Sequence, residues 1–148
     1  MTDVERNTAT IRRLEDAYAA RDDDTVRGLV AADVAAHTPG SESLPAGVEG
    51  CIAANEAGFS FFPDKQVQIE DLFGQGDRTV AHMRMTGTNT GEPVAWAGLT
   101  EKTDKPIDID WIQIARHDGE GRIVETWSQM DTPKMMVQLG AMPAPEGM

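Results

Sequence analysis

The sequence has one cysteine, few basic residues and no long apolar run. Among its 148 residues, 13 are lysine or arginine and 25 are aspartate or glutamate, so the formal net charge is −12. Such a surface repels phosphate backbones and anionic lipid, and we therefore expect neither nucleic acid nor membrane as a partner. Cys51 cannot form an internal disulfide, and its small neighbours indicate a buried core residue rather than a nucleophile.

The sequence also shows no pattern typical of a targeting signal or a membrane-spanning segment. No stretch approaches the ~20 apolar residues that a membrane span needs. The first residues are polar and acidic, with no basic stretch leading into an apolar run, so we expect no signal peptide and a cytoplasmic protein. The length suits one core, and we expect residues 1–148 to form a single domain with an irregular tail from about residue 141.

The sequence lacks several motifs that indicate a cofactor-binding site or a catalytic nucleophile. There is no Gly-rich phosphate loop, no Gly-x-Ser-x-Gly elbow and no His-Glu-x-x-His. The histidines His37, His82 and His117 fall in different predicted elements without ligand spacing, so we expect no metal site. The motifs in the sequence therefore give no indication of a metal or a cofactor.

Apolar residues at helical spacing predict three helices in the first half of the chain. Ile11, Leu14 and Tyr18 follow one another at steps of three and four, which places them on one face of an amphipathic helix. A short helix follows around residues 23–30, and a third extends over about residues 48–62. We expect Tyr18 to pack in the core with its hydroxyl reaching a polar group.

The second half alternates between apolar and polar residues, as strands do. Residues 67–69, 79–88, 107–116 and 122–130 are predicted strands, and residues 133–139 a last short helix with Thr132 as its N-cap. Helices followed by an antiparallel sheet indicate the α+β class. One curved sheet with three helices on it would leave a pocket between sheet and helices.

Asp131 is the strongest candidate for catalysis. The alternation puts it on the face that carries Trp127 and Gln129, and a carboxylate beside an indole is poorly hydrated, which suits general acid–base work. The alternative is that Asp131 caps the last helix, but Thr132 can fill that role. His37, between a short apolar segment and a Pro-Gly turn, can sit at a pocket mouth or be a satisfied surface or core histidine.

Other side chains have two interpretations. His82 and Arg84 share the polar face of a strand, which lines either a cavity or the solvent. His117 touches a hairpin turn, so solvent exposure is the simpler expectation. Phe59, Phe62 and Met83 belong to the core but can also shape an apolar cavity. The side chains that we expect around the pocket are Phe59, Phe62, His82, Met83, Arg84, Trp127 and Gln129.

Four stretches, taken in order, give the chain a family resemblance over about residues 4–141. They are residues 21–22 with 33–40, residues 62–64 with 76–81, residues 87–92, and residues 121–127 with Asp131 and residues 138–140. In order and spacing they resemble the SnoaL-like polyketide cyclases. The resemblance implies an NTF2-like, cone-shaped α+β barrel with a deep apolar pocket. The expected fold has a curved, mostly antiparallel sheet, about three N-terminal helices and a short C-terminal helix.

The same resemblance implies an activity and a site. These enzymes of antibiotic biosynthesis, of lyase or isomerase type, close the last ring of a polyketide by an intramolecular aldol condensation without cofactor. Asp131 matches their acid/base, and His37 matches a histidine that lines the pocket. By this resemblance alone, His117 is also expected to line the pocket, as another histidine of the family does. Asn89 stands where the family often has histidine.

Rival functions within the fold remain open. A cofactor-free hydroxylase or an isomerase would act on a similar small, hydrophobic, polycyclic substrate, and a non-catalytic module would only bind one. The resemblance also implies assembly through the open sheet face, as a homodimer or homotetramer.

Overall fold

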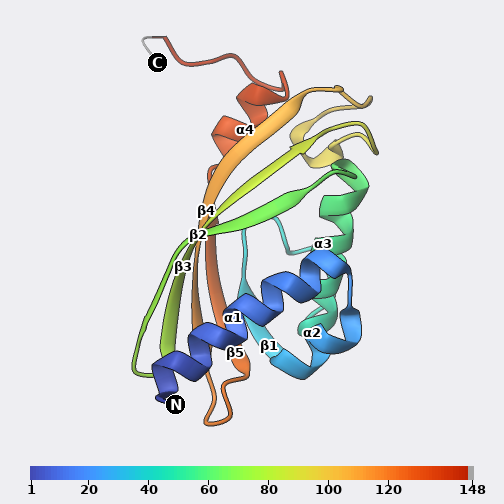
Figure 1. The fold of residues 1–148 in the computed structure, drawn as a ribbon. Helices are drawn as coiled ribbons and strands as arrows, with labels where there is room; N and C mark the ends of the chain where they lie inside the picture. Colours follow the sequence, from blue (N-terminus) through green and yellow to red (C-terminus); the bar gives the residue numbers. More distant parts are fainter. Residues whose placement is uncertain (147–148) are drawn as a thin grey trace.

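The computed structural model describes residues 1–146 and confirms the predicted α+β class. Figure 1 shows α1, α2 and α3 on one side of a curved sheet and α4 at the opposite end of the molecule from the N-terminus. The elements, in chain order, are α1 (Asp3–Ala20), α2 (Asp23–Leu29), β1 (Val30–His37), α3 (Val48–Phe61), β2 (Gln66–Gln75), β3 (Arg78–Thr88), the 3₁₀ helix η1 (Ala95–Ala97), β4 (Pro106–His117), β5 (Ile123–Met130) and α4 (Thr132–Gln138).

The sheet has five strands in the order β1-β5-β4-β3-β2. β1 pairs with β5 in parallel, and the other neighbours are antiparallel. The turns that join β2 to β3 and β4 to β5 contain Gly76 and Gly121, whose φ angles of +58° and +87° favour glycine. The strands β3, β4 and β5 form the middle of the sheet, and β1 and β2 are its edges.

The main core lies between the helices and the concave face of the sheet. α1 begins with a capping box of Thr2 and Glu5, and its apolar face buries Ile11 and Leu14 against the sheet. On β3, Met83 points into this core and is 0% exposed. A second cluster surrounds α4. The alternation along β3 and β4 thus points every second side chain into the core. We call this face of the sheet the helix side.

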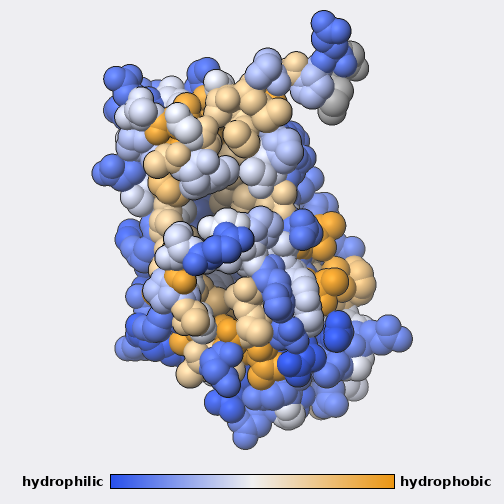
Figure 2. Space-filling view, turned by 180° about the vertical axis from the view of Figure 1, so that it is seen from behind, coloured by the Kyte–Doolittle hydropathy of each residue, from blue (hydrophilic) through white to orange (hydrophobic). Residues whose placement is uncertain are grey.

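The opposite face of the sheet, which we call the outer face, is open. Its residues are identified by the register, because paired residues point to the same face. One apolar row crosses all five strands: Phe73, Val80, Ile114 and Trp127, followed by His37. Figure 2, which views the molecule from behind Figure 1, shows a mostly hydrophilic surface with hydrophobic side chains gathered in a few patches.

After α4, residues 139–146 form neither helix nor strand. The last two residues of the predicted irregular tail, 147 and 148, lie outside the described residues. Within residues 1–146, no helix has both the length and the apolar character that crossing a membrane requires.

Candidate functional site

The residues singled out from the sequence do not line one pocket, because the sheet separates them. His82, Arg84 and Gln129 lie on the outer face, as do His37 and Trp127. Phe62 and Met83 are core residues of the helix side, and Phe59 of α3 lies on that side too. The expectation of one pocket between sheet and helices that contains them all is wrong, since alternation puts His82 and Met83 on opposite faces.

A hollow of about 290 Å³ brings three of the predicted residues together. It opens where β5 ends, and the backbone N–H of Asp131 donates to the carbonyl of Asp110 there over 3.2 Å. Within the hollow, His82 Nε2 is 3.7 Å from Asp110 Oδ2. The lining residues are His82, Asp110, Trp111, Ile112, Gln129, Met130 and Asp131. A carboxylate and an imidazole around one hollow offer a proton acceptor and a hydrogen-bond donor to a ligand.

Asp131 is the N-cap of α4, which corrects the assignment of that role to Thr132. Its Oδ1 accepts from the backbone N–H of Lys134 over 3.2 Å, and Thr132 is already the first helical residue. The expected shielding by Trp127 is also wrong, because Asp131 is exposed and Trp127 stacks on His37 instead. The short side chain of Asp131 satisfies a free N–H of the helix start, as an aspartate at this position commonly does.

His37 belongs to a charged network outside the hollow. Its ring lies 5.5 Å from the Trp127 ring, and its Nε2 is 2.9 Å from Glu125 Oε2. Glu125 also accepts from Arg116 over 3.2 Å. The hydrogen bond from His37, with help from Arg116, holds the pKa of Glu125 below its ordinary value. The structure therefore does not bring His37 to Asp131.

His117 is a structural residue, contrary to both expectations for it. It is 3% exposed rather than solvated, and it lies beside the β4–β5 turn, far along the strand from the hollow. Its Nδ1 donates to the carbonyl of Gly121 over 2.8 Å, and Nε2 lies 2.9 Å from Thr79 Oγ1. Burial lowers the pKa of His117, so its neutral form accepts from the Thr79 hydroxyl.

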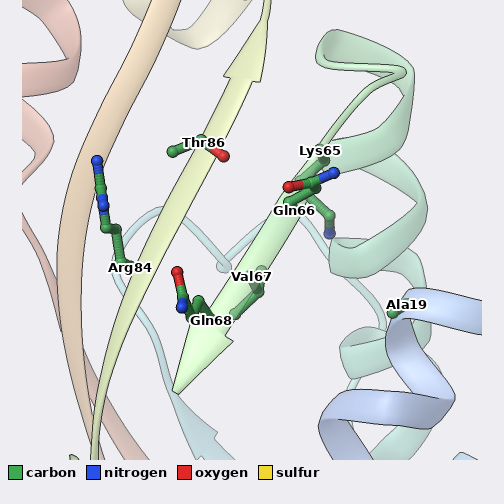
Figure 3. A pocket seen from close by; sticks show the side chains of 7 residues that line it. All are labelled: Ala19, Lys65, Gln66, Val67, Gln68, Arg84 and Thr86. Carbon is green, nitrogen blue, oxygen red and sulfur yellow. The ribbon is translucent and has the colours of Figure 1, made fainter. Parts of the chain in front are cut away.

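Arg84 lines a different hollow, of about 410 Å³, that follows β2 (Figure 3). Its guanidinium makes a two-pronged ion pair with Asp108, so its charge is already matched. The residues that line this hollow are Ala19, Lys65, Gln66, Val67, Gln68, Arg84 and Thr86. Figure 3 shows Arg84 on one side of β2, and Lys65 and Ala19 on the other.

Near that hollow, the helix side holds a polar cluster that the sequence analysis did not single out. Lys65 Nζ donates to Asn55 Oδ1 over 2.8 Å, and Asn55 Nδ2 donates to the carbonyl of Tyr18 over 3.0 Å. Burial raises the pKa of Glu15 to about 7 and lowers that of Lys65 to about 8. Burial also raises the pKa of Tyr18 and of Cys51, which face each other.

Two features of the sequence could have identified this cluster. Glu15 lies four residues after Ile11 and three before Tyr18, so it falls within the apolar stripe of the first helix. Lys65 lies two residues before Val67, so alternation puts it on the core face of that strand. A charged residue at a core position is the exception that marks a candidate functional group.

Among residues 1–146, no three or more histidine, cysteine, aspartate or glutamate side chains gather as metal ligands would.

The architecture is that of the NTF2-like fold, and comparison with known proteins identifies the family. The model of the SnoaL-like polyketide cyclases matches residues 8–139, so the chain belongs to that family. No protein among the curated sequences matches it.

Solved structures agree with the fold. IdmH from Streptomyces antibioticus is 29% identical, with a TM-score of 0.77 over 90% of this chain and 98% of its own. TsrD from Streptomyces laurentii is 22% identical, with a TM-score of 0.81 over 96% of this chain and 100% of its own. An NTF2-like protein of unknown function from Burkholderia pseudomallei is 19% identical, with a TM-score of 0.71 over 94% and 98%.

Proposed function

We propose that this protein is a cofactor-independent polyketide cyclase, which closes a ring of an aromatic polyketide by intramolecular aldol condensation with Asp131 as acid and base. The observation that carries the proposal is the hollow in which Asp131 meets His82 and Gln129. Family membership and the likeness to IdmH, itself described as a candidate polyketide cyclase, support it.

The reaction requires the protein to position the reacting groups of the substrate and to transfer a proton. The methylene group of such a substrate is acidic, because its anion spreads over the neighbouring carbonyls and rings. Asp131 takes the methylene proton, the carbanion attacks the carbonyl carbon, and the electron pair of the carbonyl moves onto its oxygen. Asp131 then returns the proton to this alkoxide, so atoms and charges balance. His82 and Gln129 would hydrogen-bond the substrate oxygens and hold carbon and carbonyl together.

The test compares wild type with Asp131→Asn on an anthraquinone-type polyketide ester that carries an unclosed ring. Asparagine is as good an N-cap as aspartate, so the variant keeps α4 and loses the proton carrier. We expect ring closure to fall by about a hundredfold or more, since general acid–base catalysis contributes roughly 10²–10⁴-fold. Asp33→Asn, which removes an exposed carboxylate elsewhere, is the control and should leave the rate unchanged.

Running the assay with and without oxygen separates the rival functions. Closure that needs no oxygen supports the cyclase, whereas product formed only with oxygen would support a hydroxylase. Full activity of Asp131→Asn would overturn the role of Asp131. Binding without turnover in the wild type would favour a non-catalytic module.

A further inference from the structure

The indole N–H of Trp111 is a buried hydrogen-bond donor without an acceptor. Within residues 1–146, the protein buries Trp111 Nε1 and places no hydrogen-bond partner beside it. An indole N–H can only donate, so no rearrangement of protons satisfies it, and a buried donor that stays unpaired costs free energy. Buried polar groups in folded proteins are almost always paired. This exception marks Trp111 as a candidate contact for a ligand atom.

The register of the sheet places the Trp111 side chain on the helix side. Its strand, β4, is the central one of the five, with two strands on either side. Trp111 pairs with Met83 of β3 and Met130 of β5, so the three side chains point to the same face, and Met83 belongs to the main core. Alternation turns the indole away from the outer-face hollow at Asp131, so only the main chain of Trp111 can line that hollow.

The space between the helices and the middle of the sheet is not completely filled. Trp111 and Gln113, which is two residues further along the same face, are both partly exposed although strands flank them on either side. Gln113 Nε2 donates to Ser128 Oγ over 3.2 Å. Gln113 Oε1 has no hydrogen-bond partner within residues 1–146 but is not buried, so solvent reaches it. Because a helix-side group on the central strand can be reached only from between sheet and helices, an accessible space lies beside Trp111.

The neighbours of the indole determine which ligand fits. Trp111 packs against the main core and against the cluster around α4, so the space beside it has apolar walls on two sides. Because Nε1 is buried in the free protein, a ligand atom reaches it only after a neighbouring side chain moves. The cross-strand neighbours Met83 and Met130 are unbranched and change conformation easily. One neutral donor within apolar walls suits a neutral ring compound that carries a carbonyl oxygen.

We propose that the helix side of β4 binds a neutral, flat ring compound whose carbonyl oxygen accepts a hydrogen bond from Trp111 Nε1. The ring lies between the two hydrophobic clusters, and a shift of Met83 or Met130 admits the oxygen. Gln113 Oε1 is the second polar group of this site and accepts from a hydroxyl group where the ligand has one. The site does not rest on the proposed cyclase activity, because the hollow at Asp131 opens on the outer face.

The experiment compares 9-fluorenone with fluorene, two flat tricyclic compounds that differ only in the carbonyl group. Equilibrium dialysis with the full chain gives the dissociation constant of each compound. We expect wild type to bind both. Trp111→Phe keeps an aromatic ring but removes the N–H, so it should weaken the binding of fluorenone about tenfold relative to that of fluorene, as the loss of one hydrogen bond does. The ratio of the two constants cancels the loss of packing that both compounds share.

Proton NMR of the indole groups tests the contact even if Trp111→Phe fails to fold. The chain has three tryptophans, Trp96, Trp111 and Trp127, and therefore three indole N–H signals. Trp96→Phe and Trp127→Phe each remove one signal, which identifies that of Trp111 by elimination. We expect fluorenone to move the Trp111 signal further downfield than fluorene does, because a hydrogen bond to oxygen deshields the proton.

Matched variants keep the result interpretable. Trp127→Phe removes an indole from the outer face and should leave the ratio of the two dissociation constants unchanged. Asp131→Asn should leave this ratio unchanged while it impairs ring closure, so that failure of this site and failure of the proposed function are distinguished. The proposal is overturned if Trp111→Phe keeps the wild-type ratio, if fluorenone leaves the Trp111 signal in place, or if wild type binds neither compound.

Discussion

Arg84 and Lys65 line the same hollow, but they extend to opposite sides of β2 and meet different surroundings. Arg84, on the outer face, is about half exposed and is paired with Asp108. Lys65 is partly buried, and its Nζ contacts two oxygens of Asn55 and the Phe59 ring. The exposed pair stays charged at all ordinary pH values. Burial, in contrast, shifts the pKa of Glu15 to about 7 and that of Lys65 to about 8, so both groups titrate near neutral pH. Location, and not residue type, decides which charge can exchange protons.

The same difference separates two carboxylates, Asp131 and Glu15. Asp131 is exposed and serves as a helix cap, and its assignment to catalysis depends on the family resemblance and on the hollow around it. Glu15 is partly buried in the apolar stripe of α1, and burial raises its pKa to about 7. Experiments that contrast the two faces therefore test how burial changes the behaviour of a carboxylate.

The largest contrast is expected for stability. Met83→Ala should lower the free energy of unfolding by about 2–5 kcal/mol, because it leaves a cavity in the core. Ile112→Ala, on the neighbouring strand but half exposed on the outer face, should cost less than about 1 kcal/mol. Urea unfolding of the two variants measures the difference. An equal loss for Ile112→Ala would mean that the outer face is covered, as in the expected homodimer or homotetramer.

The fold was predictable because local pattern and topology agree. The helical stripe of Ile11 and Leu14 and the alternation around Met83 determine the elements and which residues share a face. The alternation correctly placed Trp127 and Gln129 on one face of the sheet, but it does not say which face the helices cover. Because an apolar row crosses the outer face as well, hydrophobicity alone could not decide this.

The candidate sites depend on contacts between residues far apart in sequence, which pattern does not specify. His117 looked exposed beside its hairpin turn, yet Thr79 from another strand covers it. Lys65 and Glu15 each occupy a core position that the spacing reveals. The hydrogen bonds that link Lys65 to Asn55 and Asn55 to Tyr18, however, result from how α1 and α3 pack near the start of β2. Sequence alone could mark Lys65 and Glu15 as unusual but could not supply these contacts.

The next largest effect is the pH dependence of stability caused by Glu15. Its pKa rises from an ordinary value of 4.5 to about 7 on folding, so between these values the folded state holds a proton that the unfolded state has lost. The free energy of unfolding therefore falls as the pH rises through this window, by up to roughly 3 kcal/mol. Glu15→Gln should match wild type near pH 4 and exceed its stability near pH 8, which urea midpoints over that range would measure.

A second carboxylate of the helix side provides the control for this pH profile. Glu56 is ion-paired with Arg21, which lowers its pKa, so the stability of Glu56→Gln should fall below that of wild type as the pH rises toward about 4.5 and should stay below it at higher pH. The two difference curves are expected to have opposite signs. A flat curve for Glu15→Gln would show that the Glu15 carboxylate is hydrated in solution.

The smallest effect concerns the cap of α4, and it separates structure from chemistry at Asp131. Asp131→Ala removes the acceptor for the Lys134 N–H and should cost about 1 kcal/mol of unfolding free energy, whereas Asp131→Asn should cost little. Thermal unfolding of both variants, set beside their ring-closure rates, distinguishes the roles. If alanine alone impairs closure, Asp131 acts by holding α4. If both variants lose closure while asparagine keeps full stability, the carboxylate itself carries the proton.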